Sequence, residues 1–495
     1  MWAMSADGYR RLGAAGSAAV AAGGWAAGTL PTRDPWGIWV PHGPGVTVAA
    51  SVLAYLGLTL LVAAWWGYGR AGASVRHTLV TLGWWTAPML LAPPLYSADV
   101  YSYVAQGAMV LEGHDVYGAG PSVLDPHGPG GDAAASVGRH WTDTPAPYGP
   151  VFLVLAQAVT RLTGGGTIVP AVLGMRLIAV VALVLIVRAL RRLGRERGEG
   201  AGSAADGERG ALWLGALNPL LLMHVVGGMH NDGLMIALML TGVVLARRGR
   251  WIAGSAVVGL AVMVKSPAAV ALLFIGVMAG RAATRHRIVT GLLGPGLVAG
   301  AVAVGATLAA GTGFGWLRTQ SVAGTIHTAL SVTSDLGLGL GELLRPLLGG
   351  DPDPVKAAVQ RLGLAVALAL IVHLAWRAVR GRVDPVHALG LSLVALVALS
   401  PMVQPWYLLW GTTVVAASAW EGRAGRILAV LSAALVYETA PSGRTPAYGF
   451  ALAAVACLVT ALALRREAAA APGGSRTPVS RAAEPDRAGA QGGTP

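Results

Sequence analysis

Cysteine is almost absent from this chain, since Cys457 is the single one among 495 residues. One thiol cannot form an intrachain disulfide or a multi-cysteine metal site. Charge is also scarce: Asp, Glu, Lys and Arg make up 12% of the residues, whereas apolar residues make up 54%. A soluble domain of this length carries more charge, so the composition indicates a polytopic membrane protein.

A nucleotide-binding loop is absent too. No glycine-rich stretch is followed by Lys-Ser or Lys-Thr, the pattern that surrounds the phosphates of a nucleotide, and residues 164–166 are a flexible glycine joint only. ATP or a nucleotide sugar is therefore not expected as a direct substrate. The net charge of +13 does not indicate nucleic-acid binding, because the basic residues form short clusters between apolar runs and do not interleave with aromatic residues.

Apolar runs of spanning length, or slightly less, recur along the chain and predict an all-α protein with about fourteen transmembrane helices. They lie at about residues 11–30, 46–67, 78–95, 167–190, 210–228, 231–246, 251–265, 267–280, 288–311, 357–378, 386–402, 406–420, 426–440 and 447–464. The first run is long and others follow it, so we interpret it as a retained anchor and not as a secretory signal.

Arginine clusters fall at alternate connections between these runs and predict the orientation of the chain. The basic connections and both termini are expected in the cytoplasm, provided that residues 149–163 form an interfacial or re-entrant helix. The prediction divides the chain into N-terminal spans 1–95, a first outer region 96–166, spans 167–311, a second outer region 312–356, C-terminal spans 357–464 and a disordered cytoplasmic tail 465–495.

The first outer region begins with a stretch, residues 99–112, that reads as an interfacial helix. Its polar face at helical spacing carries Asp99, Ser102, Tyr103 and Gln106. Its apolar face carries Val100, Val104, Ala108 and Leu111, and is expected to lie on the bilayer. Asp99 is then either a helix cap or an outward-facing general base.

Three cations at or near membrane depth are candidates for binding a substrate phosphate. Lys265 lies between two apolar runs that Pro267 separates, Arg176 lies within a run, and Arg318 lies in the second outer region. Ionisable groups at membrane depth are costly and usually face a cavity or a partner charge. Alternatives stay open: Lys265 could extend to the interface, Arg176 could pair with an acidic residue, and Arg318 could face water or headgroups.

Further polar and aromatic residues on the predicted outer side are candidates for binding sugar hydroxyls and rings. These predicted sugar- or acceptor-binding residues are Tyr103, Gln106, Asp115, His230, Asn231, Asp232, Gln404, Trp406 and Tyr407. As alternatives, Asn231 or Asp232 could cap a helix, and Trp406 and Tyr407 could be interface anchors. His224 with His230 and Asp232 is a weak metal signature, so we predict no metal site.

An outward-facing base, cations at membrane depth and the missing nucleotide loop together indicate a donor that already lies in the bilayer. Lipid-phosphate sugars meet this condition without a cofactor. An acceptor hydroxyl would attack the anomeric carbon, Asp99 would accept the proton, and the cations would stabilise the departing lipid phosphate. A transporter or flippase is the alternative from another class, but paired inverted halves are not evident in the sequence.

A set of short motifs between about residues 96 and 407 points to one family. They are Asp99-Val100-Tyr101-Ser102-Tyr103-Val104-Ala105-Gln106-Gly107, Gly113-His114-Asp115-Val116-Tyr117, Gly120-Pro121, Pro147-Tyr148-Gly149-Pro150, Leu217-Asn218-Pro219-Leu220, His230-Asn231-Asp232, Lys265-Ser266-Pro267 and Gln404-Pro405-Trp406-Tyr407. As a set, they resemble the actinobacterial polyprenol-phosphate-mannose-dependent α-(1→6)-mannosyltransferases.

The resemblance implies the GT-C glycosyltransferase fold in the plasma membrane, with the active site facing outward. It also implies inverting transfer from polyprenyl-phosphate mannose to the α-(1→6)-mannan backbone of lipomannan and lipoarabinomannan. Two departures stand out: Asp99 has no adjacent acidic residue, and Val116 occupies the position where the pattern has proline. A related transferase that uses lipid-phosphate arabinose is the alternative within this enzyme class.

Overall fold

The computed structural model describes residues 4–349 and 351–470, and within this part all regular structure is helical. The α-helices are α1 (Ala6–Ala27), α2 (Pro44–Tyr68), α3 (Val75–Thr86), α4 (Asp99–Leu111), α5 (Gly131–Ala134), α6 (Pro150–Leu162), α7 (Ile168–Glu199), α8 (Ala204–Ala211), α9 (Pro219–Leu221), α10 (Asp232–Arg247), α11 (Trp251–Val262), α12 (Val270–Ala282), α13 (Arg287–Leu292), α14 (Gly294–Ala310), α15 (Trp316–Thr319), α16 (Val332–Leu348), α17 (Asp353–Val379), α18 (Pro385–Ala398), α19 (Leu408–Ala419), α20 (Arg423–Leu435) and α21 (Ala447–Ala470). Short 3-10 or π segments are η1 (Ala87–Leu90), η2 (Pro121–Val123), η3 (Leu212–Ala216), η4 (Leu222–Gly227), η5 (Ser266–Ala269), η6 (Gln320–Gly324) and η7 (Pro405–Tyr407).

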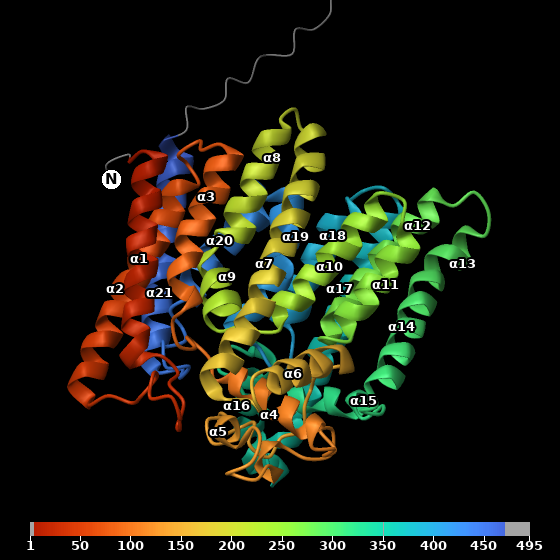
Figure 1. Ribbon diagram of the computed structural model, residues 1–495. Helices are drawn as coiled ribbons and strands as arrows, with labels where there is room; N and C mark the ends of the chain where they lie inside the picture. Colours follow the sequence, from red (N-terminus) through yellow and green to blue (C-terminus); the bar gives the residue numbers. More distant parts are fainter. Residues whose placement is uncertain (1–3, 350, 471–495) are drawn as a thin grey trace, which may run out of the picture.

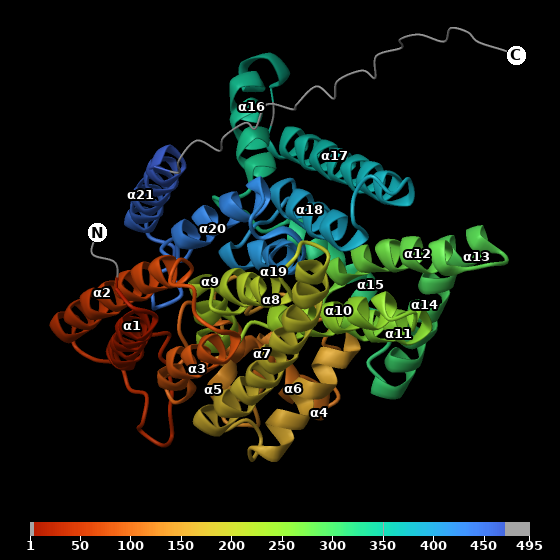
Figure 2. The same cartoon turned by 90° about the horizontal axis from the view of Figure 1, so that it is seen from above.

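Long helices stand side by side in one part of the molecule, and α4, α5, α6, α15 and α16 gather at its lower end in Figure 1. Seen from above, α7, α8, α10 and α19 lie in the middle, with α1, α2 and α3 on one side and α12, α13 and α14 on another (Figure 2). In helix α19 all residues from Leu408 to Ser418 are buried. The arrangement places α4, which begins at Asp99, at the lower end of the molecule, beneath the long helices.

Every predicted apolar run contains a helix, as the hydrophobic pattern requires. Four helices, α2, α7, α17 and α21, are long and apolar enough to cross a membrane. A fifth crossing is obtained if residues 204–216 and 219–227, which meet at a bend of 45°, count as one. The protein is therefore an integral membrane protein by composition and helix length, and the fourteen crossings stay a prediction.

Two proline breaks bring irregular backbone and polar side chains into the bundle. Between α11 and α12 the helix is interrupted at Lys265, and Pro267 lies in η5, as the sequence predicted. At the other break Asn218 accepts a hydrogen bond from the Leu220 backbone N–H at 3.0 Å and donates to Ser432 at 2.9 Å. Side-chain caps of this kind satisfy backbone groups that the break leaves unpaired.

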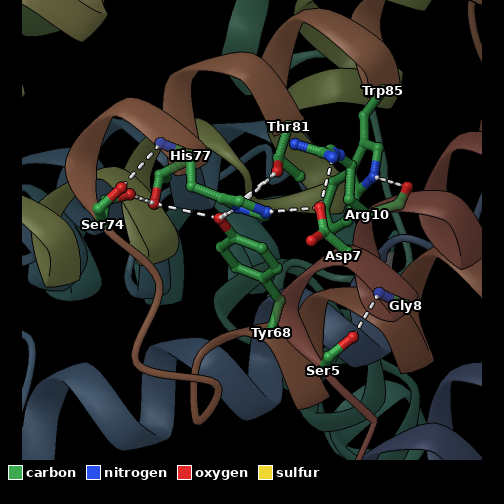
Figure 3. Close-up of polar contacts among 10 residues, drawn as sticks. Ser5, Asp7, Gly8, Arg10, Tyr68, Ser74, His77, Thr81 and Trp85 are labelled. Carbon is green, nitrogen blue, oxygen red and sulfur yellow. Dashed lines mark hydrogen bonds and ion pairs between the residues drawn. The ribbon is translucent and has the colours of Figure 1, made fainter.

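The upper ends of the first three helices are joined by a polar network (Figure 3). The Tyr68 hydroxyl lies 2.7 Å from His77 Nδ1, and His77 Nε2 lies 3.1 Å from Asp7 Oδ1. Arg10 pairs with the same carboxylate, and Trp85 Nε1 donates to the Arg10 carbonyl at 3.0 Å. The network fixes how α1, α2 and α3 pack together, away from the predicted catalytic region.

The start of α1 and the end of α21 both lie at the upper end of the bundle (Figure 1). Arg70, just after α2, pairs with Glu467 near the end of α21. This arrangement agrees with two cytoplasmic termini, but the orientation in the membrane stays a prediction. The predicted disordered tail begins inside α21, which continues to Ala470, and the rest of that segment, residues 471–495, lies outside the described residues.

Helix α4 corrects one prediction. The helix exists and begins at Asp99, but residues 100–109 are all buried, so its apolar face does not lie on a bilayer. The predicted second interfacial helix, α6, covers it: Thr160 Oγ1 donates to the Val104 carbonyl at 3.1 Å, and a Cβ on Gly107 would lie 2.6 Å from the Ala156 carbonyl oxygen. Because Gly107 has no side chain, α6 can approach α4 this closely, and α4 packs against α6 instead of lipid.

Candidate active site

The backbone before Asp99 is held between two distant segments. The Leu95 N–H donates to the Gly227 carbonyl at 3.1 Å, and the Tyr96 N–H donates to the Pro441 carbonyl at 2.9 Å. Tyr96 has a φ of 63°, a left-handed conformation that side chains other than glycine adopt at a cost. These contacts fix the direction in which the chain enters α4 and thus the position of Asp99.

Asp99 is in contact with a histidine from the start of the α10 segment. Asp99 Oδ2 lies 3.3 Å from His230 Nδ1, and the Asp99 side chain keeps 18% of its surface exposed while that of His230 has none. The His230 ring stacks on Trp406 with 3.7 Å between centroids. Asp99 is the first residue of α4 and does not cap it, so its carboxylate remains available for chemistry.

The surroundings keep Asp99 ionised. Burial raises the pKa of this carboxyl, but the adjacent His230 and the charge of Lys265 outweigh burial and hold the pKa below its ordinary value of 3.8. A carboxylate that stays ionised at neutral pH can accept a proton.

A second charge pair lies close by and is more deeply buried. Lys265 Nζ lies 3.0 and 2.9 Å from the two carboxylate oxygens of Asp232, and Trp410 Nε1 donates to Asp232 Oδ1 at 2.7 Å. The ammonium also lies 4.5 Å from the centre of the Tyr407 ring. Asp232 neutralises Lys265, and Tyr407 and Trp410 enclose the pair.

Asp99, Gln404 and Trp406 line one cavity of about 880 Å³. Its remaining arginine, histidine and carboxylate wall residues are Arg139, His140, His327, Glu438 and Arg444. Sequence reasoning missed all five. A visible signal was the placement of Glu438 and Arg444 at the outer ends of apolar runs, opposite the basic connections.

Arg176 corrects the prediction that it faces a substrate phosphate. It is 2% exposed, and its guanidinium donates to the carbonyls of Leu90, Ala92 and Pro93 at 3.1, 2.5 and 3.3 Å, and more distantly to Val226 and Gly227. The structural role anticipated for it is present, with backbone carbonyls as partners instead of a carboxylate. Its donors are engaged in holding the segment that leads to Asp99.

Arg318 and Asp115 lie together, but in a different cavity of about 500 Å³ that includes neither Asp99 nor Trp406. The predicted roles of Arg318 at a donor phosphate and of Asp115 at the acceptor therefore do not share the wall that Asp99 lines. Asp115 Oδ1 accepts a hydrogen bond from the Tyr117 backbone N–H at 3.0 Å and so forms the local turn.

Tyr103, Gln106 and Asn231 are buried and absent from the wall of the Asp99 cavity. The Tyr103 hydroxyl accepts a hydrogen bond from the Asn231 N–H at 3.4 Å, which joins α4 to the start of α10. The side-chain amides of Gln106 and Asn231 have no hydrogen-bond partner among the described residues. These three residues therefore do not line the cavity, whereas Gln404 and Trp406 do.

His224 belongs to an aromatic stack and not to a ligand cluster. Its ring lies 5.1 Å from that of Trp406 and 5.6 Å from that of His230. Within residues 4–349 and 351–470, no three His, Cys, Asp or Glu side chains gather closely enough to hold a metal ion.

Comparison with known proteins identifies the family. A sequence-family model described as the α-(1→6)-mannopyranosyltransferase N-terminal domain matches residues 10–281, more than half of the chain. A second family model, described as the MptB C-terminal domain, matches residues 333–466. The chain belongs to the α-(1→6)-mannopyranosyltransferase family. It is therefore a glycosyltransferase, and the resemblance carried by the sequence motifs is confirmed.

Curated relatives cover nearly the whole chain. A probable α-(1→6)-mannopyranosyltransferase of Mycolicibacterium smegmatis is 34% identical over 92% of this chain and 87% of that protein. α-(1→6)-Mannopyranosyltransferase A of Mycobacterium tuberculosis is 33% identical over 92% of this chain and 89% of its own length. α-(1→6)-Mannopyranosyltransferase B of Corynebacterium glutamicum is 32% identical over 84% and 73%, respectively.

Proposed function

We propose that this transferase moves mannose from polyprenyl-phosphate mannose to the end of an α-(1→6)-linked mannan on the outer face of the plasma membrane, with inversion at the anomeric carbon. The product would extend the backbone of lipomannan and lipoarabinomannan. The observation that carries the proposal is Asp99, an ionised and partly exposed carboxylate on the wall of a large cavity in a mannopyranosyltransferase.

In the proposed reaction an acceptor hydroxyl attacks the anomeric carbon of the donor. A carbon–oxygen bond to the acceptor forms, the bond from the anomeric carbon to the phosphate oxygen breaks, and its electron pair leaves with the lipid phosphate. Asp99 takes the proton from the attacking hydroxyl. His230, 3.3 Å away and stacked on Trp406, holds the carboxylate in place and so acts as a positioning residue.

Asp232 is a poor alternative base. Both its oxygens contact Lys265, one also accepts from Trp410, and its side chain is 1% exposed. Protonation of Asp232 would break its ion pair with Lys265. We assign the Asp232–Lys265 pair to the support of the site and the base role to Asp99 alone.

The test is a transfer assay in membranes that contain the protein, with polyprenyl-phosphate mannose and a short α-(1→6)-dimannoside. Wild-type protein should form a longer α-linked product, and Asp99→Asn should reduce turnover by about a hundredfold or more, the range of general base catalysis. Asp125→Asn is the matched control, because it removes an exposed carboxylate from the same region of the chain.

Each outcome of this assay separates one alternative. Equal product from wild type and an equally abundant Asp99→Asn variant would eliminate Asp99 as the base. No product from either would mean that the donor or the acceptor is wrong, and polyprenyl-phosphate arabinose would be the next donor to examine.

A further inference from the structure

We propose that Arg139 and Arg444 together bind the phosphate group of the polyprenyl-phosphate substrate, beside Asp99. The inference rests on the proposed function, since it concerns the cavity that Asp99 lines. It assigns the anion site to two residues far apart in the sequence, from the loop before α6 and from the turn between α20 and α21.

The cations singled out from the sequence are not available in this cavity. Lys265 is neutralised by Asp232 at 2.9 Å, and Arg176 is occupied by backbone carbonyls. Arg318 lines another cavity. A phosphate next to Asp99 therefore needs positive charge from elsewhere, and Arg139 and Arg444 are the arginines on the wall of the Asp99 cavity.

The loop that carries Arg139 is packed against the start of α4. Trp141 N–H donates to the Gly138 carbonyl at 2.8 Å and closes a turn around Arg139. A Cβ on Gly138 would lie 3.9 Å from the Cβ of Ala98, the residue before Asp99. Arg139 is exposed, lines the cavity and has no ion-pair or hydrogen-bond partner among the described residues.

The turn that carries Arg444 approaches the same segment. Its backbone is closed by the Ala440 N–H, which donates to the Arg444 carbonyl at 2.8 Å. Gly443 has a φ of 76°, and a Cβ there would lie 3.1 Å from the Cα of Ser97. The positive φ and the close approach both favour glycine here. The exposed Arg444 side chain likewise has no ionic partner in the described part of the chain.

Two guanidinium groups suit the charge that develops in the reaction. The donor phosphodiester carries one negative charge, and the leaving phosphomonoester gains further charge as its bond to the sugar breaks. Arginine stays protonated and presents planar N–H donors that match phosphate oxygens. The carboxylates of Asp99 and Glu438 lie on the same wall as the two arginines.

The experiment measures binding of polyprenyl phosphate, without any sugar, to the purified full-length protein in lipid nanodiscs. We expect Arg139→Gln and Arg444→Gln each to weaken binding about tenfold and the double variant to weaken it further. Arg139→Lys and Arg444→Lys should recover part of the affinity. Arg195→Gln is the charge-matched control, because Arg195 is exposed on α7 and pairs only with Glu199.

Inorganic phosphate is added as a competitor to separate recognition of the phosphate from recognition of the lipid chain. Displacement of the lipid from wild type by millimolar phosphate shows that a free phosphate suffices; resistance shows that the site needs a lipid-linked phosphate. Either result supports the site if the glutamine variants lose affinity while their melting temperatures stay unchanged. Unchanged binding in the double variant, or an equal loss in Arg195→Gln, overturns it.

The same measurement is independent of the transferred sugar. Failure of mannose transfer with intact, arginine-dependent binding of polyprenyl phosphate would count against the proposed donor sugar or acceptor and leave the anion site standing. Mannose transfer together with binding that does not depend on the two arginines would support the proposed donor sugar and reject the anion site.

Discussion

Replacing Lys265 by methionine should destabilise the fold strongly. The substitution leaves the Asp232 carboxylate 1% exposed, with Trp410 as its one remaining hydrogen-bond donor in the described structure. Removing one partner of a buried ion pair costs about 3–5 kcal/mol, because the other charge stays buried without compensation. Two contacts, at 2.9 and 3.0 Å, join this ammonium to the carboxylate, so we expect a loss within that range.

A double-mutant cycle separates this cost from the loss of the lysine side chain itself. Asp232→Leu in the Lys265→Met background removes the unpaired charge and should recover about half of the lost free energy of unfolding or more. The assay is reversible unfolding in mixed detergent micelles, followed by tryptophan fluorescence. A loss below about 1 kcal/mol in Lys265→Met, or a double variant no more stable than the single one, would refute the reasoning.

Two further predictions concern residues around Asp99. His230→Phe keeps a ring against Trp406 but removes a cause of the lowered pKa of Asp99. The pKa of Asp99 should therefore rise, and kcat/KM, which falls as this carboxylate is protonated at low pH, should begin to fall at a higher pH than in wild type. A pH profile that is identical in both proteins would contradict this. Arg176→Met leaves buried carbonyls unpaired, at about 1–3 kcal/mol each, and should lower the melting temperature and the yield of folded protein. A large fall in turnover per folded molecule with unchanged stability would restore Arg176 to the substrate site.

Local patterns gave the helices and their breaks. Apolar runs predicted the helical segments, and Pro267 marked the interruption at Lys265, because hydrophobicity and the missing proline N–H act within a few residues. The amphipathic pattern of α4 was also real, but it does not reveal whether lipid or protein covers the apolar face. Here α6 covers it, through a close approach at Gly107.

The constellation of the site depends on contacts that no local pattern encodes. Asp99 and His230 were both candidates, yet their pairing arises from the packing of α4 against the segment before α10. Arg176 met the rule that a buried cation needs a partner, but its partners are backbone carbonyls that only the folded chain exposes. Arg139 and Arg444 lie in loops far apart in the sequence, so only the tertiary structure brings them to the wall of the cavity that Asp99 lines.

The carbonyl of Pro441 also accepts a hydrogen bond at 3.3 Å from Thr29, 412 positions earlier in the chain. The segment between α1 and α2 and the turn between α20 and α21 are thus in contact next to the segment that leads to Asp99. During synthesis the carboxylate proposed as the base emerges long before the turn that completes its cavity wall. A nascent or prematurely terminated chain therefore carries Asp99 without a complete cavity around it, and under the proposed mechanism activity would begin only once the C-terminal helices have been inserted.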